Sequence, residues 1–429
     1  MSDKKDEVMR KMFGGAAVLA LVSPLPALAQ TMDHAGHGMD MGGMEMAQPA
    51  EGERPAPYAE GSGTARLPGA EGPMQGLHVM AGDWMVMVHG AVAANYTAVS
   101  GPRGDDKLYA TSMLMASATR ETSWGKIAAR TMLSLEPAMR RDGYPNLFAT
   151  GETAYGAALV DRQHPHDLFM ELAGRIDVNA GQGSLFLYGG PVGEPALGPS
   201  AFMHRGSAAF NPEPPISHHW FDSTHITYGV VTAGYAAPKW QIEASAFRGR
   251  EPDERRWNIE SGKLDSWSVR ATLNPAPAWS IQASYGEIRQ PEATHPDEDE
   301  RRFTASVHYA GPRLAAMVAY AAKRRVPGKT LPAWLGEVTW RAAPRDALFA
   351  RIEHVRNDEL FPAHDAAPHD TPFTVTKLQA GYARLVPLGP VTLAIGGSVA
   401  TFLKPAALDA AYGERPVQAT VFAKVSLGG

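Results

Sequence analysis

The stretch Val417–Leu427, VQATVFAKVSL, alternates strictly, because every odd-numbered residue in it is apolar. The residues between them are mostly polar: Gln418, Thr420, Phe422, Lys424 and Ser426. Successive side chains of a β-strand point to opposite faces, so one face of this segment meets an apolar medium and the other meets water. A tilted strand needs about 9–11 residues to cross a bilayer. The stretch therefore predicts a membrane-spanning β-strand.

The same alternation recurs along most of the chain. It predicts sixteen strands, near residues 83–96, 107–118, 123–135, 166–178, 183–190, 224–236, 239–249, 264–273, 278–288, 302–310, 313–322, 334–342, 346–356, 375–386, 390–402 and 416–427. Short connections such as 179–182 alternate with long ones such as 191–222, as expected for tight periplasmic turns and extended external loops. We therefore predict an all-β fold, a transmembrane antiparallel β-barrel of about 16 strands (roughly 14–18) in the bacterial outer membrane. The alternative is a soluble β-sandwich or propeller.

The composition agrees with a membrane barrel. Five tryptophans fall near predicted strand ends on the apolar face, where aromatic girdles contact the lipid interface: Trp240, Trp267, Trp279, Trp334 and Trp340. No apolar run approaches the roughly 18 residues of a transmembrane helix. The chain has no cysteine, so hydrogen bonds rather than disulfides must hold the fold. The net charge is -5 with no basic patch, which argues against nucleic acid and leaves membrane lipid as a partner.

Residues 1–29 have the features of a cleavable signal peptide. A basic start from Lys4 to Lys11 precedes an apolar run, Phe13–Val22, and Ala27–Ala29 supplies a small-x-small cleavage site. We therefore expect the mature chain to begin at Gln30. The alternative is an N-terminal membrane anchor, for which the apolar run is too short.

Residues 30–75 are rich in methionine, histidine, glycine and proline, and we predict that they are disordered in the periplasm, ahead of a barrel formed by residues 76–429. Thioethers are soft ligands that suit Cu(I), and imidazole also suits copper. The segment therefore predicts copper or silver binding by Met32, His34, His37, Met39, Met41, Met44 and Met46. The alternative is a flexible linker of biased composition.

Methionines continue into the first three predicted strands of the barrel. Those on the phase shared with polar residues are expected to line the lumen: Met85, Met87 and His89 in the first strand, Met113 and Met115 in the second, and Met132 in the third. They predict a patch of metal-binding thioethers on one wall of the pore. The alternative is that these side chains pack against an inward-folded loop or the N-terminal segment.

The two longest loops carry a third group of candidate ligands: His164, His166, Asp167, His218, His219, Asp222 and His225. Loops of this length can fold into the pore, where imidazoles and carboxylates bind a borderline metal or act as acid–base groups. The alternative is a hydrogen-bond network that braces the loops against the wall, with Arg162, Glu171, Arg175 and Asp177 as partners. The stretch His295–Arg302 is expected to be a solvated external loop without function.

A Met/His-rich exported leader, Met32–Met46, followed by an outer-membrane barrel resembles the copper-resistance protein B type of Gram-negative bacteria. The resemblance implies copper tolerance, by sequestration or by passage across the outer membrane. It further implies copper, as Cu(I) or Cu(II), as the bound metal and periplasmic copper-handling proteins as partners. The His164–His225 region lies outside the resemblance.

These features together predict a non-enzymatic outer-membrane barrel that binds soft metal. Two alternatives stay open. One is a general porin whose leader is incidental. The other is a barrel-embedded hydrolase that uses the loop histidines with a neighbouring serine, Ser217 or Ser223.

Overall fold

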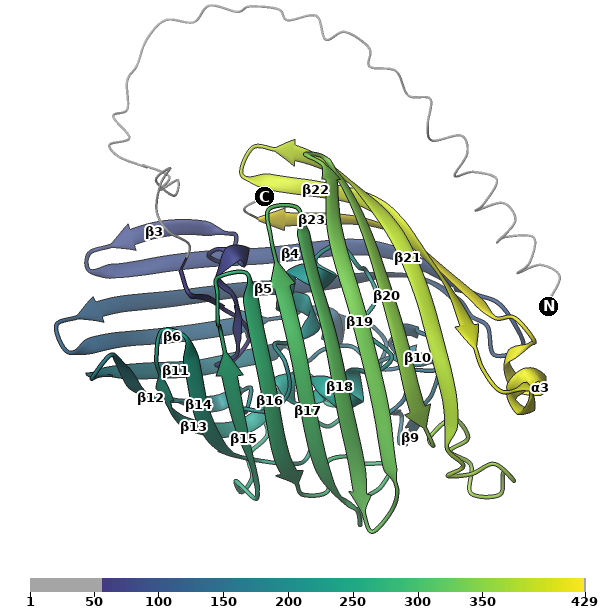
Figure 1. Cartoon of the computed structure of the whole chain (residues 1–429). Coiled ribbons are helices and arrows are strands. Elements are labelled where there is room, and N and C mark those ends of the chain that lie inside the picture. The colour runs from purple at the N-terminus through teal and green to yellow at the C-terminus, as the bar shows by residue number, and fades with distance from the viewer. Residues whose placement is uncertain (1–55, 428–429) are drawn as a thin grey trace, which may run out of the picture. The chain divides into compact units, whose positions relative to one another are not determined.

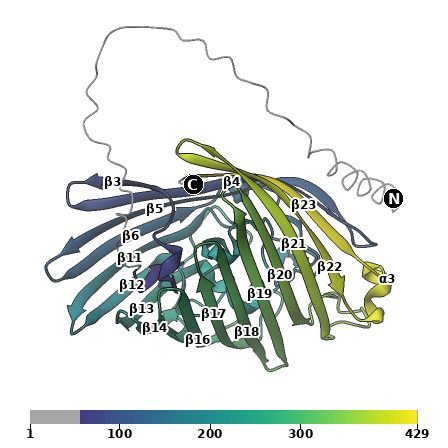
Figure 2. The ribbon, with the colours of Figure 1, turned by 45° about the horizontal axis from the view of Figure 1, so that its top comes forward.

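Sixteen antiparallel strands close into a barrel in the computed structural model, which describes residues 56–427 (Figures 1 and 2). Each strand is hydrogen-bonded to its neighbours in the chain order, and all sixteen predicted segments are confirmed. The strands are β4 (Trp84–Val99), β5 (Asp106–Thr122), β6 (Gly125–Leu133), β11 (Phe169–Ala180), β12 (Gly183–Gly193), β13 (Thr227–Ala236), β14 (Trp240–Phe247), β15 (Ser266–Leu273), β16 (Trp279–Ile288), β17 (Asp299–Ala310), β18 (Leu314–Val326), β19 (Thr330–Ala343), β20 (Asp346–Asn357), β21 (Phe373–Leu388), β22 (Val391–Leu403) and β23 (Val417–Leu427).

The last strand closes the barrel against the first. β23 pairs with β4 from Gln418 opposite Val99 to Ser426 opposite Ala91, in a continuous antiparallel register. Beyond that point a short additional strand, β3 (Leu77–Ala81), continues along the same edge of β4. Closure leaves the sixteen-stranded sheet without a free edge, which is the condition for a sheet to lie in lipid.

The alternation of side chains separates a lipid face from a lumen face. In β14 the odd positions are buried and the even ones exposed: Gln241, Glu243 and Ser245 point inward, whereas Trp240 and Ile242 point outward. Polar residues therefore face the interior and apolar residues the membrane, which is the reverse of a soluble protein. No helix among residues 56–427 is long and apolar enough to cross a membrane.

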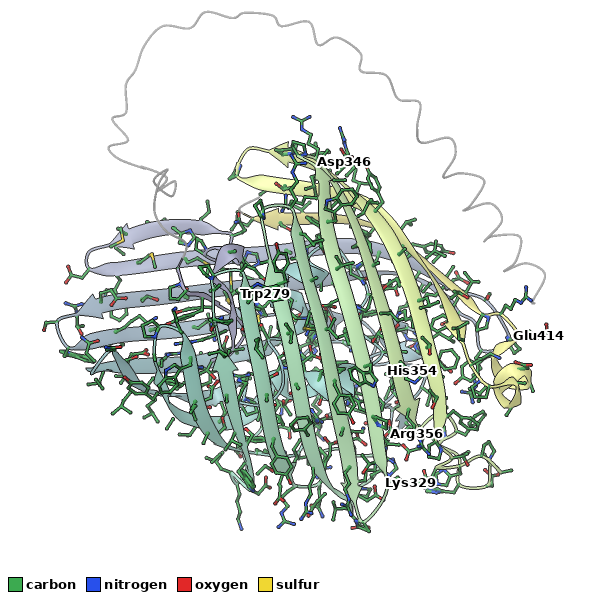
Figure 3. The ribbon with its side chains drawn as sticks, viewed as in Figure 1. Trp279, Lys329, Asp346, His354, Arg356 and Glu414 are labelled. Carbon is green, nitrogen blue, oxygen red and sulfur yellow. The ribbon has the colours of Figure 1, made fainter. Side chains whose placement is uncertain are left out.

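The five predicted interface tryptophans are all exposed on the outer surface. Near the short turns, Trp240 packs on Tyr235 at 5.3 Å between ring centroids and Trp279 on Tyr309 at 4.9 Å. Toward the long loops, Trp334 packs on Tyr320 at 4.7 Å. Figure 3 shows Trp279 on the outside of the wall, toward the same end as Asp346 and away from Lys329. The aromatic residues thus form two girdles, as the sequence indicates.

The prediction of disorder through residue 75 is wrong for residues 56–75. They contain a small hairpin, β1 (Tyr58–Glu60) and β2 (Arg66–Pro68), and a turn of 3₁₀-helix, η1 (Gly69–Glu71). This segment, here called the plug, is held by lumen-facing groups: the Arg66 guanidinium donates to the Ala237 carbonyl at 2.8 Å, and the Ser280 hydroxyl to the Arg66 carbonyl at 3.0 Å. Composition alone did not reveal these wall partners.

Two long loops also fold into the barrel. The loop between β6 and β11 contains η2 (Glu136–Ala138), β7 (Tyr144–Pro145), β8 (Glu152–Ala154), β9 (Ala157–Leu159) and β10 (Arg162–Gln163). The loop between β12 and β13 contains η3 (Phe202–His204), η4 (Gly206–Ala208), α2 (His218–Phe221) and η5 (Ser223–His225). The loop between β22 and β23 carries η6 (Ala406–Leu408) and α3 (Asp409–Tyr412).

Buried ion pairs clip the β12–β13 loop to the wall. Arg205 of the loop donates to Glu337 of β19 at 2.7 Å and to Asp222 at 3.0 Å, and all three side chains are buried. Lys377 of β21 lies 2.8 Å from Glu213 of the loop. Because these buried, charge-assisted hydrogen bonds join residues of the loop to residues of the barrel strands, they fix the loop inside the lumen.

Candidate metal centre

Five imidazoles from the two inward-folded loops gather inside the barrel, and all five are buried. The ring centroid of His218 lies 5.1 Å from that of His225 and 5.4 Å from that of His219, while His166 and His225 are 5.4 Å apart and His164 and His166 are 6.2 Å apart. This group is called the five-histidine cluster below. Two imidazoles that share one tetrahedral ion at about 2 Å have ring centroids roughly 5 Å apart. The spacing therefore approaches that of a metal site.

Oxygen atoms orient the Nδ1 atom of four of these imidazoles, and the partner of His164 is the Pro165 carbonyl at 3.1 Å. Nδ1 of His218 lies 2.8 Å from the Asp222 carboxylate, Nδ1 of His166 lies 3.0 Å from the Glu136 carboxylate, and Nδ1 of His225 lies 2.7 Å from the Asp222 carbonyl. The Nε2 atoms of His166 and His225 are buried without a hydrogen-bond partner. An imidazole held at one nitrogen and free at the other is the usual arrangement of a metal-ligating histidine.

The closest set of ligand atoms belongs to Glu152, His164 and His219, which all lie within 4.8 Å of one another. Nε2 of His164 is 3.2 Å from the Glu152 carboxylate. Nδ1 of His219 is 3.4 Å from the Glu251 carboxylate. Two imidazoles with one carboxylate form a ligand set that suits Zn²⁺ or Cu²⁺.

The protonation of the cluster divides it into two kinds of imidazole. Burial lowers the pKa of His164 and of His225 well below the usual value, and also lowers that of His218. Burial also lowers the pKa of His219, but the charge of the Glu251 carboxylate and its hydrogen bond have a larger effect and raise this pKa to about 9. Glu136 likewise raises the pKa of His166 against the effect of burial. Near neutral pH three imidazoles are therefore uncharged, the form in which a nitrogen lone pair can bind a metal.

The two predicted carboxylate ligands serve mainly to position their neighbours. Asp167 lies 3.1 Å from Arg256 and accepts a hydrogen bond from Tyr228 at 3.1 Å. Asp222 is shared between Arg205 and His218. Both carboxylates thus have cationic partners of their own, as Glu152 does in Arg256 at 3.0 Å. The shortest of these carboxylate–imidazole distances is that between Asp222 and His218, 2.8 Å.

The lumen methionines predicted from three adjacent strands lie side by side. The register places His89 of β4 opposite Met115 of β5, and Met115 opposite Met132 of β6. Met87, Met115 and Met132 are buried in one cluster, which Met113 joins. The sequence missed three further members, Met74, Met170 and Met203, because they come from the plug, the start of β11 and a loop. We call these seven residues the thioether cluster.

Met85 does not belong to the thioether cluster. It is 43% exposed and lies opposite Met80 of β3, where β4 extends past the end of β23. The leader ligands from Met32 to Met46 lie outside the described residues.

A cavity of about 150 Å³ connects the two clusters. Its lining includes Glu136 and His166 at the five-histidine cluster and Met113, Met170 and Met203 of the thioether cluster. His89 and Lys424 complete the wall of the cavity toward the short-turn end of the barrel.

The bracing partners expected for the loop histidines are wrong. Arg162 pairs with Asp105 at 2.5 Å, Glu171 with Arg130 at 2.7 Å, and Arg175 with Asp177 at 2.8 Å. The groups that contact the imidazoles are Glu136, Glu152, Glu251 and Asp222. All four carboxylates lie in connections between barrel strands, where no periodic signal marks them, and only Asp222 is among the predicted ligands.

The hydroxyl groups near the cluster do not form a nucleophile–base pair. Ser217 donates to the Glu353 carboxylate at 2.8 Å, and Ser223 accepts from Arg302 at 3.0 Å. Within residues 56–427 neither serine is hydrogen-bonded to an imidazole, so the arrangement lacks the contact that a serine hydrolase requires.

Comparison with known proteins gives a likeness of fold. No protein-family model matches the sequence, and no curated protein sequence does. Among solved structures, OmpF of Salmonella typhi, in complex with daunomycin, superposes with a TM-score of 0.53 at 8% identity, covering 82% of this chain and 100% of that one. OprB of Pseudomonas putida gives a TM-score of 0.49 at 9% identity over 80% of this chain and 94% of its own. An anion-selective porin from Comamonas acidovorans gives 0.47 at 12% identity over 80% and 100%.

Only the first of these likenesses is close enough to carry an argument, and at this identity it concerns the fold alone. Together with the closed sheet, the apolar outer face and the two aromatic girdles, it leads to one statement. The chain is a sixteen-stranded β-barrel of the bacterial outer membrane with a porin-like fold.

Proposed function

We propose that this protein is a narrow outer-membrane channel that binds and passes transition-metal ions, and that copper is its cargo. The observation that carries the proposal is the five-histidine cluster, buried inside the barrel, in which the Nε2 atoms of His166 and His225 have no hydrogen-bond partner among residues 56–427. Unpartnered polar atoms are costly to bury, so a group of them in one place favours a ligand that the protein evolved to hold.

The filling of the lumen supports a narrow channel. The plug and the two inward-folded loops occupy the interior, and the cavity between the clusters holds about 150 Å³. A water molecule takes roughly 30 Å³, so this space suits an ion with a few waters rather than a large solute.

The ligand atoms of the two clusters differ in chemical softness, since one cluster offers imidazole nitrogens and the other thioether sulfurs. This difference favours copper over other ions. Imidazoles with a carboxylate suit Zn²⁺ or Cu²⁺, whereas thioethers select Cu(I). Copper is the metal that both sets suit. Passage needs sites that release as well as bind, and a row of neutral thioethers meets that need better than a thiolate site would.

The first test measures metal bound to the purified barrel in detergent. The His164→Ala/His219→Ala variant removes two of the three closest ligands, so we expect its affinity for Cu²⁺ and Zn²⁺ to fall at least about tenfold. The control is His354→Ala, because His354 is exposed on the outer wall beside Thr376 (Figure 3). Equal binding by all three proteins, measured by calorimetric titration, would contradict the proposal.

The second test concerns Cu(I). Leucine has nearly the volume of methionine but no sulfur, so changing Met87, Met113, Met115 and Met132 to leucine should preserve packing and reduce Cu(I) bound within the lumen. We propose that the leader residues Met32–Met46 capture copper before this step, as the resemblance to the copper-resistance protein B type implies. A chain that lacks residues 31–46 should then lose most of its bound Cu(I), and the leucine variant a further part. Unchanged Cu(I) content in both would remove the thioether and leader sites from the proposal.

A general porin for small polar solutes is the second candidate, and the porin-like fold favours it. Such a channel would conduct potassium chloride in planar bilayers and would be insensitive to the histidine and methionine substitutions. A metal channel should show conductance that added Cu²⁺ reduces in the unaltered protein but not in the His164→Ala/His219→Ala variant.

A further inference from the structure

A second group of imidazole and carboxylate ligands lies at the mouth of the barrel formed by the long loops. Glu292 and His295 come from the connection between β16 and β17, and Glu359 from the connection between β20 and β21. Their ligand atoms all lie within 4.8 Å of one another. We propose that Glu292, His295 and Glu359 form a separate site for a divalent transition-metal cation at the external mouth. The site is a different set of residues from the five-histidine cluster and does not depend on the function proposed above.

The imidazole of His295 lies between two carboxylates. Its Nε2 atom is 3.4 Å from Glu359 and its Nδ1 atom is 3.7 Å from Glu298. The side chain of His295 is 16% exposed and that of Glu359 is 7% exposed, so the site is sheltered yet can be reached from the external side. A cation could enter here without opening the barrel.

The charges around the site leave an excess of acid. Four carboxylates, those of Glu292, Glu298, Asp358 and Glu359, meet only two cationic side chains, those of Lys323 and Arg325. Two negative charges stay unbalanced when His295 is neutral and all four carboxylates are ionised, although burial and the Glu359 carboxylate raise the pKa of Glu292 to about 7, so that a proton on Glu292 also reduces the excess. A divalent cation would balance them, whereas a buried acidic excess without one is costly.

One atom of the site has no partner. Lys323 lies 2.6 Å from Oε1 of Glu292, and Arg325 lies 2.5 Å from Oε1 of Glu359. Oε2 of Glu359 is buried and accepts no hydrogen bond from any group in residues 56–427. Bracing of the loops by Lys323 and Arg325 accounts for the first contacts but leaves this oxygen unexplained. A bound metal ion would satisfy it.

No feature of the sequence predicts this site, since the stretch from His295 to Arg302 has the composition of a solvated loop. The expectation of a solvated loop is wrong for Glu300 and Arg302, which are buried in β17 and paired at 2.6 Å. It also missed that His295 turns back toward Glu359, because the contact joins residues 64 positions apart in two different loops.

The mixed ligand set indicates the kind of ion. Imidazole suits Zn²⁺, Cu²⁺ and Ni²⁺, whereas Mg²⁺ and Ca²⁺ prefer oxygen ligands only. Three protein ligands with room for water form the usual open zinc coordination. We therefore expect Zn²⁺ to bind and Mg²⁺ not to compete at similar concentrations.

The experiment titrates Zn²⁺ into the detergent-purified full barrel that already carries His164→Ala/His219→Ala, so that two of the three closest inner ligands are absent. We expect about one remaining Zn²⁺ site, weakened at least tenfold by Glu359→Gln or by His295→Gln and unaffected by His354→Ala. Glutamine keeps a polar side chain in each place, and strand content measured by circular dichroism confirms that the variants are folded. Absence of a remaining site, or equal binding by all variants, would overturn this inference without touching the inner site. Loss of inner binding alone would leave it standing.

Discussion

Replacing Arg205 by methionine should open the channel and destabilise the barrel. Arg205 is fully buried and donates to Glu337 on the wall, to Asp222 in its own loop and to the Ser200 carbonyl at 2.9 Å. Methionine keeps much of the volume but removes the cation that Glu337 and Asp222 share, so that Glu337 keeps only Arg351 at 3.2 Å and Asp222 keeps His218 at 2.8 Å as ionisable partners among residues 56–427. Removal of one partner from a buried ion pair costs about 3–5 kcal/mol, so part of the loop should leave the wall.

We expect a several-fold rise in single-channel conductance together with unfolding at lower urea concentration. The matched control is Arg384→Met, which removes a cation of the same kind from an exposed pair with Asp346 on the outer surface (Figure 3). Exposed pairs contribute about 0–1 kcal/mol, so this variant should behave like the unaltered protein. A destabilised barrel with unchanged conductance would mean that the loop does not restrict the pore.

Deletion of the plug should raise conductance further. Residues 57–71 lie against the inside of the wall near the short turns: the backbone of Ala70 donates to the Pro277 carbonyl at 2.9 Å, and Gln241 donates to the Thr64 carbonyl at 2.8 Å. The Thr64 hydroxyl also contacts Glu243 and accepts from Arg270 at 3.0 Å. Without the plug, Glu243 and Arg270 still hold each other at 2.9 Å, so the wall should stay folded.

Planar-bilayer recording of the deletion variant checks this expectation, and deletion of residues 31–46 is the control for the length of the N-terminal segment. The plug deletion should conduct several times more current than the unaltered barrel, whereas the leader deletion should not. A milder variant, Thr64→Val, removes one anchoring hydroxyl and should raise the frequency of open events. If the plug deletion conducts no better than the control, the two loops alone close the lumen.

The strand plan follows from local pattern. A strand that separates lipid from a polar lumen must alternate along its own length, so a segment such as Val417–Leu427 shows its role without knowledge of its neighbours. The same local rule placed Met87, Met115 and Met132 on the lumen phase. The rule failed for Met85 because β3, rather than β23, pairs with that end of β4. The sequence of a strand does not show which other strand pairs with its end.

The five-histidine cluster follows from contacts between distant residues. His164 and His219 meet only because two loops fold into the same lumen. Glu136 and Glu152 reach the imidazoles from the β6–β11 connection, and Glu251 does so from the β14–β15 connection. Loops have no periodic alternation of polar and apolar residues. The partner of a buried charged group depends on which residues are close in space and not on their spacing along the chain. For that reason the alternation of side chains was enough to predict the barrel and its lipid face, whereas the plug, the carboxylates around the histidines and the acidic site at the mouth emerged only once the chain was closed in three dimensions.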